Sequence, residues 1–189
     1  MERRAAIHAY LDVVSDNANA LKAKASEIAK AATILIECLG AGNKVLFCGN
    51  GGSAADAQHL AAELMGRYRR ERAPMAAVAI TVDTSTLTAV SNDYAFDDVF
   101  ARQVRGLGRT GDVLVALSTS GNSKNVVNAA TAAKALGMQT IAMTGKGGGA
   151  LKDLADLTIA VPSPTTSHIQ EMHIAVGHLL CGFVEDALG

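Results

Sequence analysis

Short apolar runs alternate with segments of helical spacing along most of the chain after residue 43. The runs are bounded by glycine, proline or polar residues, which is typical of strands, and they lie at residues 44–49, 76–80, 112–118, 139–145 and 157–161. Helices are predicted at 53–69, 84–107, 123–136, 148–154 and 167–188. Apolar strands separated by helices pair in parallel. The pattern therefore predicts an α/β fold, a three-layer sandwich with a five-stranded parallel sheet flanked by helices.

The N-terminal part of the chain has a different pattern, because it is rich in alanine and carries apolar residues at helical spacing. This spacing predicts two helices over residues 3–39, or one long bent helix, ending near Gly40. The sequence contains neither an internal repeat nor a low-complexity linker. We therefore expect one domain over residues 1–189, with a helical segment (1–40) and an α/β core (41–189).

Composition and charge limit the classes of ligand. Hydrophobic residues make up 49% of the chain, charged residues 19%, and the net charge is −1, so charge gives no general reason to bind nucleic acid or a membrane. The N-terminus lacks the apolar core of a signal peptide, and no apolar run approaches the roughly 20 residues of a membrane span. The three cysteines form no CxxC pair and lie in apolar runs, which predicts free thiols in a reducing cytoplasm.

The first of two polar loops follows the first predicted strand and reads "GNGGS", from Gly49 to Ser53. Ligands of parallel α/β sheets bind beyond the carboxyl ends of the strands. Glycines permit positive φ angles and close backbone approach, and the following helix supplies unpaired N–H groups for an anion. The letters also fit the dinucleotide pattern G-x-G-x-x-A. However, the acidic ribose-binding residue of that pattern would fall in the mostly basic run "GRYRRER", which argues against a dinucleotide.

The second polar loop follows the third predicted strand and reads "STSGNS". It places four hydroxyl groups around a glycine at the start of a helix, on Ser118, Thr119, Ser120 and Ser123. Hydroxyl and N–H donors at the positive end of a helix suit a phosphate without lysine or arginine. Simple N-capping would need one hydroxyl, so the loop favours phosphate binding.

Polar residues on two predicted helices are candidates for chemistry. Asp56, His59 and Glu63 share one helix face, and a His–Glu pair four apart could hold a divalent metal or transfer a proton. A solvent-facing polar stripe would have the same spacing, although the neighbouring positions are apolar. Gln170 and His178 lie eight residues apart on the last helix. They could meet one metal only if their side chains converge, and His178 would equally fit a buried core histidine.

Together these motifs resemble the SIS (sugar isomerase) domain family over nearly the whole chain. The resemblance rests on "GNGGSAADAQH", "AAELMGRY", "TAVSNDYAF", "VFARQV", "GDVLVALSTSGNSKNV" and "IQEMHIAVGHLLCG". It implies an isomerase that converts sedoheptulose 7-phosphate to D-glycero-D-manno-heptose 7-phosphate through an enediol. That reaction is the first step toward nucleotide-activated heptose for bacterial surface glycans such as lipopolysaccharide. It also implies a homotetramer with sites at subunit interfaces. The alanine-rich N-terminal helices would then pack the subunits together, although a role in the core of one chain explains their composition equally well.

The resemblance also implies roles for individual residues. Glu63 and His178 would be the catalytic pair. One zinc ion per subunit would be held by His59, Glu63, Gln170 and His178. The phosphate would lie on Ser118, Thr119, Ser120 and Ser123, and the sugar would be lined by Asn50, Gly51, Gly52, Glu63, Asn92, Asp93 and Gln170.

In the mechanism that we expect, Glu63 removes the proton on carbon and His178 exchanges protons with the sugar oxygens or assists ring opening. Zinc would polarise the carbonyl. Because a carboxylate bound to zinc is a weaker base, His178 remains an alternative carbon base.

The alternatives are a non-catalytic SIS protein, a different sugar-phosphate isomerase, a phosphosugar sensor and a nucleic-acid-binding protein. A non-catalytic SIS protein that binds a partner such as the replication initiator would lack the acid–base pair, which is present here as Glu63 and His178. A phosphosugar sensor would carry an attached DNA-binding region, which we do not find. The basic run 66–72 could be a nucleic-acid patch, but we interpret it as a solvated helix C-terminus, where the helix dipole favours cations.

Overall fold

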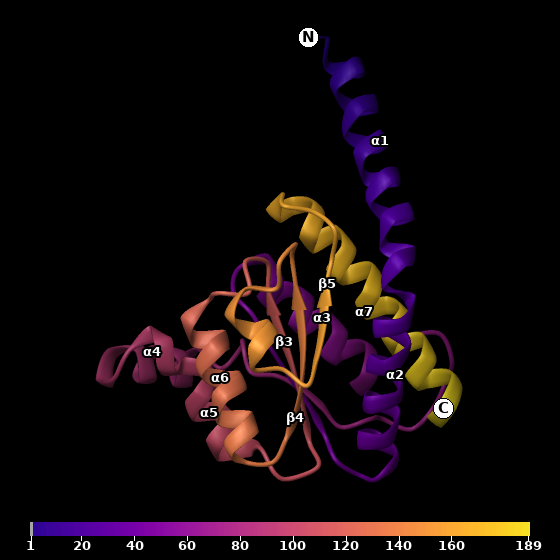
Figure 1. The fold of residues 1–189 in the computed structure, drawn as a ribbon. Coiled ribbons are helices and arrows are strands. Elements are labelled where there is room, and N and C mark those ends of the chain that lie inside the picture. The colour runs from indigo at the N-terminus through magenta and orange to yellow at the C-terminus, as the bar shows by residue number, and fades with distance from the viewer. Residues whose placement is uncertain (1) are drawn as a thin grey trace.

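Five parallel strands form the central sheet of the computed structural model, which describes residues 2–189 (Figure 1). They are β1 (Val45–Cys48), β2 (Ala77–Ala79), β3 (Val113–Ser118), β4 (Gln139–Thr144) and β5 (Leu157–Ala160). Each strand lies within its predicted range, and the spatial order is β2-β1-β3-β4-β5. The predicted five-stranded parallel sheet is therefore confirmed.

The strand order reverses at β1, and this places the two polar loops side by side. β2 pairs with one edge of β1 and β3 with the other, in a register that aligns Val45 with both Ala77 and Val113. The connection after β1 leads to the strand on one side of it, and the connection after β2 leads to the strand on its other side. Such a reversal of strand order opens a crevice at the carboxyl ends of the strands. The loops after β1 and β3 meet at this crevice.

Helices cover both faces of the sheet, as predicted. One layer contains α2 (Ala25–Gly40), α3 (Gly52–Met65) and α7 (Thr166–Leu188), and the other contains α4 (Thr84–Asp93), α5 (Val99–Leu107) and α6 (Lys124–Ala135) (Figure 1). Side chains alternate along each strand. Val45 and Phe47 therefore pack in the core under α2, α3 and α7, whereas Leu46 and Cys48 pack in the core under α5 and α6.

The N-terminal segment consists of two helices, α1 (Arg3–Leu21) and α2, joined by the 3₁₀ turn η1 (Lys22–Lys24). This agrees with the first of the two predicted alternatives. α1 extends away from the sheet (Figure 1), and its Tyr10 hydroxyl donates a hydrogen bond to Glu171 of α7. Ile7 and Leu11 of α1 are exposed in the single chain, at 59% and 58%. The apolar face of α1 is therefore uncovered by the rest of this chain.

Three predicted helices differ from those observed. α3 ends at Met65, four residues before the predicted end, because Gly66 follows it with a non-helical backbone. The predicted helix over 84–107 is divided by the 3₁₀ turn η2 (Phe96–Asp98), and residues Gly149–Asp153 form a 3₁₀ helix, η3. Within residues 2–189, no helix is long and apolar enough to cross a membrane.

The basic run after α3 is not a solvated helix end throughout, so that interpretation was wrong for one of its members. The side chain of Arg72 is 2% exposed, and its Nε lies 3.3 Å from Oε1 of Glu185. The Arg72 guanidinium also donates hydrogen bonds to the carbonyl groups of Glu63, Leu64 and Gly66. Arg72 therefore caps the carboxyl end of α3 from inside the protein.

His173 of α7 is fully buried, and its ring nitrogens make no hydrogen bond with a described side chain. Burial lowers the pKa of His173 from 6.5 to about 4, offset in part by the Thr144 backbone. The unfolded chain therefore binds a proton between pH 6.5 and 4 that the folded chain does not. We expect acid to destabilise the fold in this window by up to about 3 kcal/mol. Urea unfolding across this pH range would measure the loss.

The variant His173→Leu is the matched comparison, because it removes the titrating ring and leaves a side chain of similar size. Its free energy of unfolding should depend less steeply on pH over the same window. Parallel curves for the two proteins would contradict this account of the acid sensitivity.

Candidate active site

α3 and α7 run side by side in the same direction, and a glycine lets them approach closely. A Cβ atom added to Gly177 of α7 would lie 2.4 Å from the Leu60 side chain of α3, so a larger residue would require Leu60 or the helices to move. At the start of α3, a Cβ atom added to Gly52 would lie 2.5 Å from Nε2 of Gln170 on α7. The close contact at Gly177 places the next residue, His178, opposite the polar face of α3.

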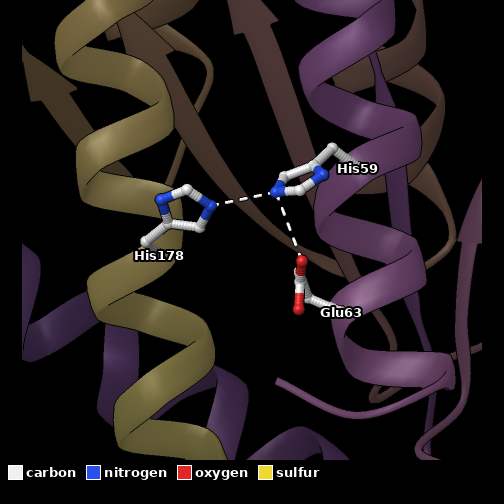
Figure 2. Close-up of side chains that lie close together, drawn as sticks. All are labelled: His59, Glu63 and His178. Atoms are coloured by element: carbon white, nitrogen blue, oxygen red, sulfur yellow. Dashed lines mark hydrogen bonds and ion pairs between the residues drawn. The ribbon is translucent and has the colours of Figure 1, made fainter. Parts of the chain in front are cut away.

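Two imidazoles and one carboxylate converge between these helices (Figure 2). His59 Nε2 lies 2.9 Å from His178 Nε2 and 3.3 Å from Glu63 Oε1. One ligand atom from each residue lies within 4.8 Å of the others. The side chains of His59 and Glu63 are 46% and 20% exposed, so the cluster is open to solvent. The half-buried His178 is therefore part of a surface cluster and not a core histidine.

The donor set of this cluster suits zinc. Two imidazole nitrogens and a carboxylate oxygen are ligands that catalytic zinc sites use, with a further position left for water or substrate. His59, Glu63 and His178 can approach one point because their ligand atoms already lie close together. The geometry thus fits a divalent metal ion.

Two other predicted residues lie away from this cluster. The Gln170 side chain contacts Gly52, and Gln170 is about 12 Å from His178 along an ideal helix. Gln170 thus faces the first polar loop, and metal binding by its side chain stays a prediction. Asp56 is not among the three clustered groups. Burial raises the pKa of its carboxyl, and the nearby His59 lowers it in part.

The first polar loop is tied to the second by a pair of amides. Asn50 Nδ2 donates to Asn125 Oδ1 at 2.8 Å, and Asn125 Nδ2 donates to Asn50 Oδ1 at 2.9 Å. Asn125 lies in the first turn of α6 and is 2% exposed. The Asn50 side chain therefore ties the first loop to the start of α6, and Gly51, with a φ of 55°, is the N-cap of α3. Sequence reasoning missed Asn125, because the pairing joins residues 75 positions apart.

The hydroxyl group of Ser123 in the second polar loop does not cap α6. Ser123 is the N-cap of α6, but its side chain makes no capping hydrogen bond. Its Oγ lies 2.9 Å from Oγ of Ser118, and Ser120 Oγ accepts a hydrogen bond from the Asn122 N–H at 3.1 Å. The geometry therefore does not support simple N-capping as the reason for these hydroxyls. Phosphate binding by Ser118, Thr119, Ser120 and Ser123 stays a prediction.

A glycine-rich turn supports the second polar loop from behind. Gly121 has a φ of 68°, and an added Cβ would lie 2.0 Å from the carbonyl oxygen of Gly148. The Gly145 N–H also donates to the Thr119 carbonyl at 3.0 Å. Both the backbone angle and the close contact with Gly148 therefore require glycine at position 121.

Asn92 and Asp93 lie on the other side of the molecule. They are the last two residues of α4, both are exposed, and the Asn92 amide donates to the Asp93 carboxylate at 2.9 Å. α4 packs against α5 and η2, in the layer opposite α3 and α7 (Figure 1). One chain alone therefore does not bring Asn92 and Asp93 to the His59–Glu63–His178 cluster.

The comparisons with known proteins agree with this fold. The family model described as the SIS domain matches residues 9–145. A protein named phosphoheptose isomerase from Rhodospirillum rubrum is 60% identical over 182 residues, covering 96% of this chain and 97% of that protein. One from Akkermansia muciniphila is 59% identical over 172 residues and 91% of each chain.

Solved structures give the same result. The phosphoheptose isomerase of Neisseria gonorrhoeae has a TM-score of 0.92 at 44% identity, covering 97% of this chain and 98% of that chain. The Francisella tularensis enzyme has a TM-score of 0.94 at 39% identity, covering 98% and 100%. The chain belongs to the SIS domain family and, within it, to the phosphoheptose isomerases. The alternative of a non-catalytic partner-binding SIS protein finds no support in these relatives.

Proposed function

We propose that the protein converts sedoheptulose 7-phosphate to D-glycero-D-manno-heptose 7-phosphate. The observation that carries this proposal is the convergence of Glu63 and two imidazoles between α3, which begins at the first polar loop, and α7. The high identity to proteins named phosphoheptose isomerase supports the choice of a heptose phosphate as substrate. The product would then enter the synthesis of nucleotide-activated heptose.

The reaction moves a proton between C1 and C2 of the open-chain sugar through a cis-enediol. It needs a base at carbon and a donor at the developing oxyanion. We assign the base to Glu63. Its Oε1 faces His59 at 3.3 Å, whereas Oε2 makes no hydrogen bond with residues 2–189 and is available for the proton on carbon. We assign proton transfer at the sugar oxygens to His178, which lies across the site from Glu63 (Figure 2).

Zinc is the cofactor that we propose, one ion per subunit. His59, Glu63 and His178 would hold it, with Gln170 as the predicted fourth ligand. When bound, zinc supplies Lewis-acid polarisation of the substrate carbonyl. Glu63 would thus be a ligand as well as the base, and its carboxylate has two oxygen atoms for these roles.

The phosphate would be anchored by the second polar loop. Ser118, Thr119, Ser120 and Ser123 supply hydroxyl groups there, and the N-terminus of α6 supplies N–H groups and partial positive charge. The Asn50–Asn125 amide pair fixes this loop relative to the first loop. The backbone of Gly51 and Gly52 then lines the sugar, with Gln170 beside it.

We also propose a homotetramer in the cytoplasm. Asn92 and Asp93 lie far from the cluster within one chain, so a neighbouring subunit would supply them to line the sugar. Exposed apolar side chains on α1 and α7, such as Leu11 and Phe183, offer surface for subunit packing. The three cysteines are buried free thiols, as predicted, which suits a reducing compartment.

Purified protein incubated with sedoheptulose 7-phosphate tests the proposal. We expect the aldose product to form, and we expect unphosphorylated sedoheptulose to be converted far less efficiently because it lacks the anchor. Both are measured by chromatography of the sugars. No conversion of the phosphorylated sugar by folded, zinc-loaded protein would overturn the proposed function.

A further inference from the structure

The segment after α3, residues 66–72, contacts both helices of the active site. Arg72 Nη2 donates a hydrogen bond to the carbonyl group of Glu63 at 2.7 Å, and Nη1 donates to that of Leu64 at 2.9 Å. These carbonyls lie in the last turn of α3, where helical partners are missing. Arg72 therefore holds the backbone of the residue that we assign as the base.

A buried carboxylate on α7 anchors the same segment. Glu185 is 1% exposed, and it accepts hydrogen bonds from the backbone N–H groups of Tyr68, Arg69 and Arg70 at 3.0, 2.8 and 3.1 Å. Burial alone would raise the pKa of the Glu185 carboxyl, but these donors and Arg72 outweigh it and the pKa is lowered. Glu185 stays ionised and fixes the segment to α7.

The anchored segment presents Tyr68 to His178. The two rings are nearly parallel, with an interplanar angle of 18° and centroids 5.7 Å apart. Tyr68 crosses α7 above Gly182, where an added Cβ would lie 3.4 Å from the ring. The Arg69 guanidinium lies 4.7 Å from the Tyr68 ring centroid, and Arg69 donates to the Tyr68 hydroxyl at 3.3 Å. Tyr68 thus contacts both Arg69 and His178.

The other ring contact of His178 is edge-to-face with His59, at 5.1 Å between centroids. Within residues 2–189, its hydrogen-bonding contact is the one between its Nε2 and His59, and Nδ1 makes none. Metal-binding and catalytic histidines usually donate the second ring nitrogen to a carboxylate or carbonyl, which fixes the ring. Stacking on Tyr68 is the restraint that takes the place of that hydrogen bond.

We propose that Tyr68 is a positioning residue that sets the orientation of the His178 imidazole, and that the Glu185–Arg72 pair holds Tyr68 and α3 in place for this purpose. The inference rests on the proposed role of His178. The segment 66–72 would then contact both proposed catalytic residues. Arg72 binds the Glu63 carbonyl, and Tyr68 stacks on the His178 ring.

The variants Tyr68→Leu and Tyr68→Phe test the inference. Phenylalanine keeps the stacked ring and loses the hydroxyl group, whereas leucine removes the flat face. We expect Tyr68→Leu to lower kcat for sedoheptulose 7-phosphate by about tenfold or more, with KM changed less than about threefold because the phosphate loop is untouched. Tyr68→Phe should restore most of kcat.

A second readout does not depend on turnover. Titration of the zinc-free protein with Co²⁺, followed by its visible absorption, should show an altered spectrum and about tenfold weaker binding for Tyr68→Leu, with Tyr68→Phe resembling the wild type. Tyr68→Met is made alongside, so that a folding failure of one variant leaves the other. Val104→Ala, in the opposite layer of the sheet, is the control for general destabilisation and should alter neither readout.

Two results would overturn the inference. One is wild-type kcat and Co²⁺ binding in both folded Tyr68→Leu and Tyr68→Met. The other is an equal loss in Tyr68→Phe, which would assign the effect to the hydroxyl group and not to stacking. If wild-type protein failed to convert sedoheptulose 7-phosphate, the proposed function would fall, while the Co²⁺ titration would still decide the role of Tyr68.

Discussion

Replacing Glu63 with glutamine is expected to lower kcat for sedoheptulose 7-phosphate by about 10²- to 10⁴-fold, the range of general acid–base catalysis. Glutamine has nearly the same shape but cannot accept the proton from carbon at neutral pH. The substrate phosphate would still be anchored by the loop after β3, so KM should change much less than kcat. Steady-state kinetics of the purified variant measure both constants.

The control for this experiment is Glu37→Gln, which neutralises an exposed carboxylate of α2 far along the chain from the site. It should leave kcat within about twofold of wild type, since surface changes away from a site are nearly neutral. The zinc content of Glu63→Gln must also be measured, because Glu63 is a proposed ligand. Near-normal turnover by folded Glu63→Gln with unchanged zinc content would exclude Glu63 as the base.

Removal of zinc is expected to abolish nearly all turnover. His59, Glu63 and His178 lie within 4.8 Å of one another, and without a cation the carbonyl of the sugar would lose its Lewis acid. Dialysis against a chelator, then against chelator-free buffer, should give an inactive protein. Stoichiometric zinc should restore activity. The same addition should raise the thermal unfolding midpoint, because an ion that binds the folded state stabilises it, by about 4 kcal/mol at a thousandfold excess over Kd.

His59→Asn is the companion variant for the zinc experiment. His59 is a proposed ligand but neither the base nor the acid, so His59→Asn should need a higher zinc concentration for half-maximal activity. Full activity of chelator-treated wild-type protein, with zinc shown to be absent by elemental analysis, would contradict a role for the metal. An unchanged unfolding midpoint on adding zinc would contradict binding at this cluster.

The sequence was enough to predict the fold because its signals are local. Runs such as Val113–Ser118 are buried on both faces and could only be central strands, and the glycines and hydroxyls after them lie where parallel sheets bind ligands. The spacing of His59 and Glu63 on one helix face is also local, and the structure brings them together at 3.3 Å.

The contacts that complete the site are long-range, and sequence reasoning did not reach them. The Asn50–Asn125 pair joins residues 75 positions apart, and Glu185 binds backbone N–H groups more than 110 positions away. Nothing in the run "GRYRRER" distinguishes Arg72, which is buried, from Arg70, which is exposed. Only the packing of α3 against α7 determines which arginine is enclosed.

The Gly177–Leu60 contact also has a consequence for how far α7 can slide along α3. A shift by one turn, about 5.4 Å, would bring His173 or Cys181 over Leu60 in place of a residue without a side chain. Either residue would collide with the Leu60 side chain, because even a single added carbon at Gly177 would lie 2.4 Å from it. The absence of a side chain at Gly177 therefore favours one position of α7 along the axis of α3. The distance between the imidazoles of His59 and His178 depends on this relative position of the two helices.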